Sequence, residues 1–290
     1  MLAVKARDLT FKWKNSTNKE LITLNNVNFS IFPGDFLGII GENGSGKSTL
    51  LKMISGLLKP SCGEVLINNI NVFKYLKEKR ENRFNIGVVF QNPEEQLFGK
   101  TLYEDIAFAL KNMSLSPNEI KNRVLDAIRF VNLSEEKLIF PLNKISGGEK
   151  RKAAIAGIIA MLPKILLLDE PTAGLDNISS KVILENIKKY NKESKATVIL
   201  VTHNLEDILK YANKILILNN GTLSAFCETK DIFLDKNLKL IYSYLAEPSK
   251  VLVSLKNKGY NICNLNKEIF KDTDDIVNVI FGLLENNSAV

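Results

Sequence analysis

The segment from Gly41 to Ser48 combines residue types that bind the phosphates of a nucleotide. Its sequence is Gly-Glu-Asn-Gly-Ser-Gly-Lys-Ser, and it lies between an apolar run at 36–40 and residues with the apolar spacing of a helix. Strand, glycine loop and helix are the context that this phosphate-binding pattern requires. Glycine reaches positive φ, so that successive N–H groups turn toward an anion, and the positive end of the helix adds to the attraction.

Within this loop, Lys47 is expected to reach the β- and γ-phosphates, and the Ser48 hydroxyl to bind Mg²⁺. A glycine-rich turn ahead of a helix is the plain structural alternative, but the flanking strand and helix favour phosphate binding. The nucleotide contacts that we expect are Gly41, Asn43, Gly44, Ser45, Gly46, Lys47, Ser48 and Thr49.

A pair of acidic residues follows the apolar run at 165–168 and supplies the remaining chemistry of phosphate transfer. Ligands of open α/β sheets bind at the carboxyl ends of the strands, which is where Asp169 and Glu170 fall. Asp169 is expected to hold Mg²⁺, directly or through water, and Glu170 to act as general base on the attacking water. An acidic cap leading into Pro171 is the structural alternative.

A second anion-binding helix terminus is predicted at Ser146-Gly147-Gly148. Serine is a good N-cap, and the two glycines leave backbone N–H groups free. An ordinary capped helix is the alternative, and the segment by itself does not decide between the two.

The elements that must position these residues alternate between strand and helix. Apolar strand runs at 36–40, 86–90, 165–168 and 197–201 are separated by helical stretches, the longest of them between about 100 and 160. This alternation predicts an α/β fold with a mostly parallel sheet covered by helices. Two strands at about 3–13 and 24–32 precede the loop, and Asn219-Asn220-Gly221 predicts a hairpin turn.

The composition of the 290 residues is that of a globular protein. The N-terminus lacks the apolar core of a signal peptide, and the longest apolar stretch, 153–162, is too short to span a bilayer. Cys62, Cys227 and Cys263 are too few and too scattered for a disulfide framework or a zinc site, so we expect a cytosolic compartment. The net charge of +7 favours a solvated basic face, with a membrane surface or nucleic acid as alternatives.

The order of these motifs resembles that of the nucleotide-binding subunits of ATP-binding cassette (ABC) transporters. Residues 173–176, Ala-Gly-Leu-Asp, are similar to the family's D-loop and end in Asp176, a further expected nucleotide contact. Thr202-His203 is similar to its switch histidine, and His203 is the chain's one histidine. The resemblance implies a P-loop nucleotide-binding domain over 1–228, with an N-terminal antiparallel β subdomain and a helical signature subdomain at about 92–162. It leaves 229–290 as a small C-terminal helical extension that helps two ATPases to pair.

The resemblance also assigns roles position by position. Gln91 matches the glutamine that senses Mg²⁺ and the γ-phosphate, and Trp13 falls where an aromatic side chain stacks on adenine, with Phe11 as the alternative. Ile145 and Glu149 replace the leucine and the glutamine that are usual in the signature. The catalytic residues implied are Lys47, Gln91, Glu170 and His203, and the Mg²⁺ ligands are Ser48, Gln91 and Asp169.

The family's architecture implies a head-to-tail pair of ATPase subunits, identical or paralogous. In such a pair Ser146 to Gly148 of one subunit close over the γ-phosphate of ATP bound to the other. A single cassette without a membrane segment further implies separate transmembrane subunits and a position on the cytoplasmic face of the membrane.

A narrower resemblance lies in residues 91–98, Gln-Asn-Pro-Glu-Glu-Gln-Leu-Phe, which are similar to those of energy-coupling factor (ECF) ATPases of the cobalt and nickel type. It implies an importer of a vitamin or a transition-metal ion, with a coupling protein in contact with Gln96 and a separate membrane protein that binds the cargo. ATPases of other ABC transporters are the main alternative. A soluble ABC ATPase acting on nucleic acid fits less well, because the chain has no second cassette or long insertion.

Overall fold

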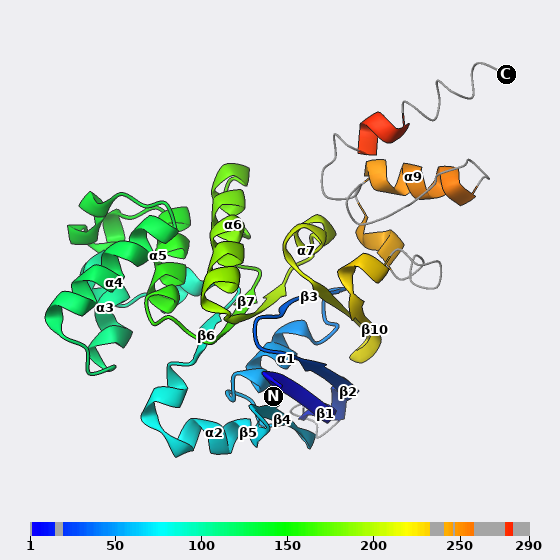
Figure 1. Cartoon of the computed structure of the whole chain (residues 1–290), viewed down its shortest axis with the longest axis horizontal. Helices are drawn as coiled ribbons and strands as arrows, with labels where there is room; N and C mark the ends of the chain where they lie inside the picture. Colours follow the sequence, from blue (N-terminus) through cyan, green and yellow to red (C-terminus); the bar gives the residue numbers. More distant parts are fainter. Residues whose placement is uncertain (1, 15–19, 233–240, 246, 258–275, 281–290) are drawn as a thin grey trace.

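A six-stranded sheet and a four-stranded sheet form the frame of the computed structural model (Figure 1), which describes residues 2–14, 20–232, 241–245, 247–257 and 276–280. The larger sheet has the strand order β10-β9-β3-β8-β7-β6, in which only β10 runs antiparallel to its neighbour. Its strands are β3 (Phe36–Gly41), β6 (Ile86–Val89), β7 (Ile165–Asp169), β8 (Thr197–Val201), β9 (Lys214–Asn219) and β10 (Thr222–Glu228). The predicted mostly parallel sheet and the β9–β10 hairpin are therefore confirmed.

The four-stranded sheet is antiparallel and built chiefly from the N-terminal residues, as predicted. Its order is β2-β1-β4-β5. The strands are β1 (Val4–Lys14), β2 (Glu20–Ile31), β4 (Cys62–Ile67) and β5 (Ile70–Asn71). Because β2 also lies near β10 and α1, this sheet holds the loop that joins β3 to α1 from the side.

Helices cover the parallel sheet and form a separate cluster beside β6 (Figure 1). The α-helices are α1 (Lys47–Ile54), α2 (Val72–Glu78), α3 (Leu102–Lys111), α4 (Pro117–Phe130), α5 (Gly147–Ile159), α6 (Asn177–Ser194), α7 (Leu205–Tyr211) and α9 (Glu247–Asn257). Short 3₁₀ turns are η1 (Arg80–Arg83), η2 (Pro93–Gln96), η3 (Glu135–Ile139), η4 (Leu142–Lys144), η5 (Thr229–Asp231) and η6 (Tyr242–Tyr244).

Side-chain caps begin the helices of this cluster. The hydroxyl of Thr101 accepts from the N–H of Glu104, and that of Ser116 accepts from the N–H of Glu119, so each hydroxyl satisfies an N–H that has no partner within the helix. The Glu104 carboxylate in turn accepts from the N–H of Lys100, one residue before the cap.

Two apolar clusters pack against the opposite faces of the parallel sheet. Along β3, Phe36 and Ile40 belong to the cluster that includes α3–α7, whereas Leu37 and Ile39 belong to the one that includes α1, α2 and the four-stranded sheet. This alternation follows from the period of two in a strand, and burial of both faces explains why the strand runs are apolar throughout.

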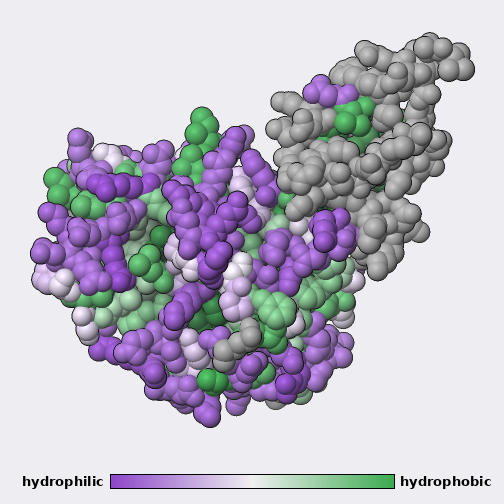
Figure 2. All heavy atoms as spheres, in the orientation of Figure 1, coloured by the Kyte–Doolittle hydropathy of each residue, from purple (hydrophilic) through white to green (hydrophobic). Residues whose placement is uncertain are grey.

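Residues beyond 228 join the first of these clusters. Ile232, Ile241, Leu252 and Ile276 are fully buried within it, and α9 confirms a helix in the C-terminal part. The division of the chain at residue 228 and the extension's pairing role stay predictions, and Cys263 lies outside the described residues. Within the described ranges no helix is both long and apolar enough to cross a membrane. The face in Figure 2 is largely hydrophilic, with scattered apolar side chains.

Candidate nucleotide-binding site

The loop between β3 and α1 adopts the conformation that its glycines predict. Gly44 and Gly46 have φ of +79° and +100°, and Gly46 is the N-cap of α1. A Cβ at Gly46 would lie 2.8 Å from the carbonyl oxygen of Thr23. Gly41 does not have the positive φ that we expected. Glycine is required there because a Cβ would lie 2.4 Å from the carbonyl oxygen of Leu218.

Lys47 is buried beneath this loop. Its Nζ donates to the carbonyl oxygens of Gly41 at 2.7 Å and Glu42 at 2.8 Å. Burial lowers the pKa of Lys47, and the charges of Glu170 and Asp169 oppose the change. The ammonium group therefore stands close to the acids at the end of β7.

Asp169 is the last residue of β7 and is almost completely buried. Burial raises the pKa of its carboxyl, and a hydrogen bond from the side chain of Ser48 opposes the rise. The structure thus brings together Ser48 and Asp169, two of the three side chains expected to hold Mg²⁺.

Glu170 lies next to His203. The Glu170 Oε1 is 3.6 Å from the His203 Nδ1, and the N–H of Glu170 donates to the carbonyl of Val201 at the end of β8. Glu170 also has a φ of +48°, in a region that costs about 1–3 kcal/mol and is concentrated at functional sites. Two neighbouring parallel strands therefore present the acid and the imidazole at one edge of the sheet.

A cavity of about 340 Å³ opens at this edge, and eight of the predicted site residues line it. Its lining residues are Thr23, Asn43, Gly44, Gly46, Lys47, Ser48, Thr49, Gln91 and Glu170. Sequence reasoning missed Thr23, which lies in β2. Thr23 reaches the cavity only because the folded four-stranded sheet places β2 beside the loop between β3 and α1. The buried Ser45 hydroxyl has no hydrogen-bond partner among the described residues. An orphaned hydroxyl behind a glycine loop with a buried lysine fits a site that an anionic ligand completes.

Trp13 and Asp176, two further predicted contacts, are not part of this cavity lining. Trp13 is half exposed and meets the Phe11 ring edge-on at 5.0 Å, whereas Phe11 is buried in the core. Trp13 is therefore the aromatic side chain with a face left for stacking. Asp176 caps α6 by accepting from the N–H of Ser179 at 2.8 Å, and this bond lowers the pKa of Asp176.

The segment Ser146 to Gly148 also lies outside the cavity. Ser146 and Gly147 are exposed at the N-terminus of α5, and a Cβ at Gly147 would meet nothing within 4 Å. An open helix terminus away from the chain's own loop is the arrangement expected if it serves a second molecule.

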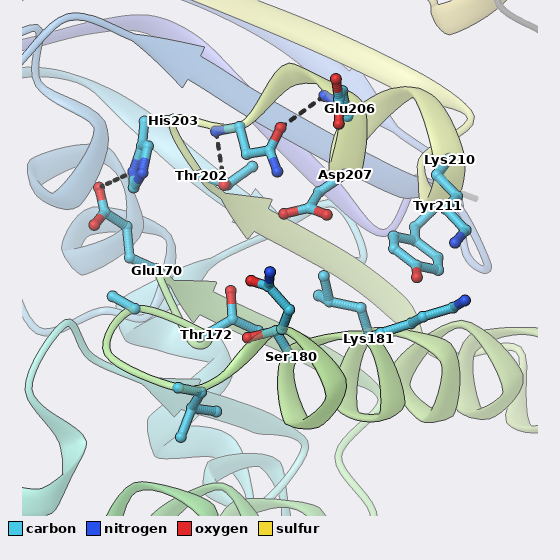
Figure 3. Close-up of a pocket in the computed structure, with 15 residues that line it drawn as sticks. Glu170, Thr172, Ser180, Lys181, Thr202, His203, Glu206, Asp207, Lys210 and Tyr211 are labelled. Atoms are coloured by element: carbon cyan, nitrogen blue, oxygen red, sulfur yellow. Dashed lines mark hydrogen bonds and ion pairs between the residues drawn. The ribbon is translucent and has the colours of Figure 1, made fainter. Parts of the chain in front are cut away.

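A second hollow of about 390 Å³ continues from Glu170 and His203 between α6 and α7 (Figure 3). Asp207 projects into it from α7, with Lys181 on the opposite helix. Burial raises the pKa of Asp207 to about 6, with Glu206 adding to the rise and Lys210 and His203 opposing it. No sequence motif predicts a role for Asp207. It lines this hollow only because α7 packs beside α6.

Arg151 joins the segment after Gln91 to α5. Its guanidinium is buried, with Nε 3.1 Å from the Glu94 Oε2 and another nitrogen donating to the carbonyl oxygen of Gln91. The helix that begins at the Ser146 segment is therefore tied to the residues that follow Gln91.

Comparisons with known proteins agree with this geometry. The ABC transporter family model matches residues 24–173. An ECF transporter ATP-binding protein EcfA2 from Caldanaerobacter subterraneus subsp. tengcongensis is 40% identical over 262 residues, covering 90% of this chain and 92% of the relative. The chain belongs to the ABC transporter ATP-binding family, in its energy-coupling factor branch. It is an ATP-binding protein with the fold of an ABC ATPase.

Two solved ABC cassettes have the same fold. CbiO1 from Clostridium perfringens, described as part of the transporter complex CbiONQ, has a TM-score of 0.70 and 32% identity, covering 89% of this chain and 97% of that one. A dimeric post-hydrolysis state of the cassette MJ0796, bound to ADP and Pi, has a TM-score of 0.71 and 32% identity, covering 78% and 98%.

Proposed function

We propose that this ABC ATPase hydrolyses ATP to energise an ECF-type importer of a vitamin or a transition-metal ion of the cobalt or nickel type. The observation that carries the proposal is the convergence of Lys47, Glu170 and Gln91 on one cavity, with Asp169 buried against Ser48 beneath it. An energy-coupling factor relative that aligns over 90% of the chain supports the transport assignment.

In the proposed reaction, Glu170 accepts a proton from water as the water oxygen attacks the γ-phosphorus, and the bond to the β–γ bridging oxygen breaks to release ADP. Lys47 and His203 stabilise the charge on the phosphoryl oxygens. Mg²⁺ would neutralise charge on the phosphates, and Ser48, Asp169 and Gln91 would hold it. The 3.6 Å contact between Glu170 and His203 holds the base at the cavity.

The active unit that we propose is a head-to-tail pair of such ATPases. The exposed terminus at Ser146 and Gly147 would meet the γ-phosphate of ATP in the second subunit, and its absence from the chain's own cavity lining supports this assignment. Asp176 and the residues beyond 228 are proposed to contribute to the same pairing.

The proposed membrane partner is a transmembrane coupling protein that accompanies a cargo-binding membrane protein. Phe98 and Phe108 are both at least half exposed and form an edge-to-face pair with ring centroids 4.6 Å apart. Next to them, Gln96 is exposed at the end of η2. Exposed aromatic pairs are typical of interaction sites, so this surface is our candidate contact at the cytoplasmic face of the membrane.

The substitution Glu170→Gln tests the proposed reaction. We expect kcat to fall by about 10²-fold or more because the general base is lost, while ATP still binds and holds two ATPase subunits together. Steady-state ATPase assays and light scattering with MgATP measure the two effects. Glu185→Gln, on the exposed side of α6, is the control and should leave kcat unchanged. Unchanged turnover in Glu170→Gln would contradict the assignment.

A further inference from the structure

Glu149 places a carboxylate beside the serine that begins α5. Ser146 and Glu149 form a reciprocal capping box, in which the Ser146 Oγ donates to the Glu149 Oε2 at 2.8 Å and the Ser146 N–H donates to the same oxygen at 3.0 Å. The hydroxyl hydrogen of Ser146 is therefore committed to Glu149.

This arrangement conflicts with the role proposed for Ser146. To bind the γ-phosphate of a second subunit, the hydroxyl must donate to phosphate oxygen, and the N-terminus of α5 must attract an anion. A negative charge at Glu149 repels that anion across a few ångströms and competes for the hydroxyl hydrogen. A glutamine, which the resembling family usually carries here, would add no charge.

Lys137 supplies the opposite charge. It reaches back from η3, and its Nζ pairs with the Glu149 Oε1, the oxygen that Ser146 does not use. Both side chains are partly buried, at 33% and 24% exposure, where a charge is screened less than at an open surface. Lys144, Lys150 and Lys152 lie nearby in the chain, but within the part that the structure describes only Lys137 is recorded in an ion pair with Glu149.

We propose that Lys137 is a charge-compensating residue that neutralises Glu149, so that Ser146 and the start of α5 accept the γ-phosphate of ATP held by the second subunit. The inference rests on the head-to-tail pairing proposed above. It predicts that Lys137 matters only while Glu149 carries its charge, and a double-mutant cycle measures that dependence.

The test compares four forms of the full chain: wild type, Lys137→Ala, Glu149→Gln and the double variant. Each form is assayed in the membrane complex that co-purifies with it. Lys137→Ala should lower kcat/KM for MgATP about tenfold, with the larger part in KM. Glu149→Gln should raise kcat/KM about twofold, because glutamine keeps the capping box and removes the repulsion. Adding Lys137→Ala to Glu149→Gln should then change kcat/KM by less than about twofold.

Two controls separate charge compensation from a structural role. Lys144→Ala removes an exposed lysine from η4, just before Ser146, and should leave kcat/KM within about twofold of the wild type. Lys137→Met keeps most of the aliphatic stem and should show the same tenfold defect as Lys137→Ala. The defect should also shrink at about 0.5 M salt, because ions screen the uncompensated carboxylate.

A Lys137→Ala defect that persists in the Glu149→Gln background would overturn the inference, as would an equal defect in Lys144→Ala or wild-type kinetics in Lys137→Ala. A wild-type complex that hydrolyses no ATP would contradict the proposed function itself, and the inference with it.

Discussion

Burial shifts the pKa of three side chains, Lys47 and Asp169 at the nucleotide cavity and Asp207 in the neighbouring hollow. It lowers the pKa of Lys47 and raises those of Asp169 and Asp207, which in each case favours the neutral form. Anionic phosphates beside Lys47 and a cation beside Asp169 would favour the charged forms again. Ligand binding and the ionisation of these two groups are therefore linked.

Asp207 gives the stability of the folded chain a testable pH dependence. The pKa of its carboxyl is about 6 in the folded chain, above the ordinary value of 3.8. The native state therefore binds more protons than the unfolded state between about pH 4 and pH 6. The charged carboxylate lowers the free energy of unfolding above pH 6, and this penalty disappears as the pH falls toward 4.

Asp207→Asn should accordingly stabilise the protein at pH 7.5 by on the order of 1–2 kcal/mol, a figure reduced for the water that still reaches the site. The gain over wild type should shrink at pH 5, and urea titrations at the two pH values measure it. Charges facing Asp207 are those of Glu206, Lys210 and His203. An equal gain at both pH values would assign the effect to something other than ionisation.

At this scale, sequence predicted the residues that a local motif defines. Lys47, Asp169 and Glu170 each follow directly from a strand end or a glycine loop, and the structure places them together. Thr23 and Asp207 carry no such pattern, because their positions depend on how β2 and α7 pack against distant parts of the chain.

At the scale of elements, the sequence did not predict that Arg151 connects α5 to the segment that begins at Gln91. Periodicity predicts α5, and the family resemblance marks Gln91, but neither places a buried guanidinium between them. The N-caps at Thr101 and Ser116 were predictable because a cap bonds to residues two or three positions away. Contacts between elements 57 or 60 residues apart depend on the tertiary fold.

Arg151→Met should destabilise the chain by about 2–3 kcal/mol. It leaves Glu94 without its cation and the Gln91 carbonyl without its donor, and breaking a largely buried pair costs more than breaking an exposed one. Arg123→Met is the matched control, because its i,i+4 pair with Glu119 is more exposed than the pair of Arg151 with Glu94 and should contribute less than about 1 kcal/mol. Urea unfolding compares the two, and equal losses would contradict the tie.

At the scale of the whole molecule, the predicted α/β architecture is confirmed, since apolar runs buried on both faces specify a parallel sheet. Two surfaces on this frame face outward, in our proposal, to other subunits: the terminus of α5 and the aromatic pair Phe98 and Phe108. The pairing of Phe98 with Phe108 was not predictable, because it needs the turn after η2 to fold back onto α3.

The double substitution Phe98→Ala/Phe108→Ala should lower recovery of a membrane partner about tenfold or more when the chain is purified from membranes, because interface energy is concentrated in a few aromatic residues. ATP binding by the isolated chain should remain. Leu57→Ala, which removes a comparably exposed apolar side chain at the end of α1, is the control. Quantitative mass spectrometry of co-purified membrane proteins measures the outcome, and equal recovery in all three forms would contradict the proposed contact.

The apolar cluster on the α3–α7 face of the sheet is continuous from the helices beside β6 to Ile241, Leu252 and Ile276. The residues beyond 228 therefore contribute to the same hydrophobic core as the rest of the chain. A chain shortened at residue 228 would expose the part of its core that these residues now cover, and its cassette would be prone to aggregate even with every phosphate-binding residue intact. A C-terminal extension taken from a relative would pack well only if the cassette residues that contact it were exchanged with it. Substitutions in the extension and in those cassette residues are therefore expected to occur together.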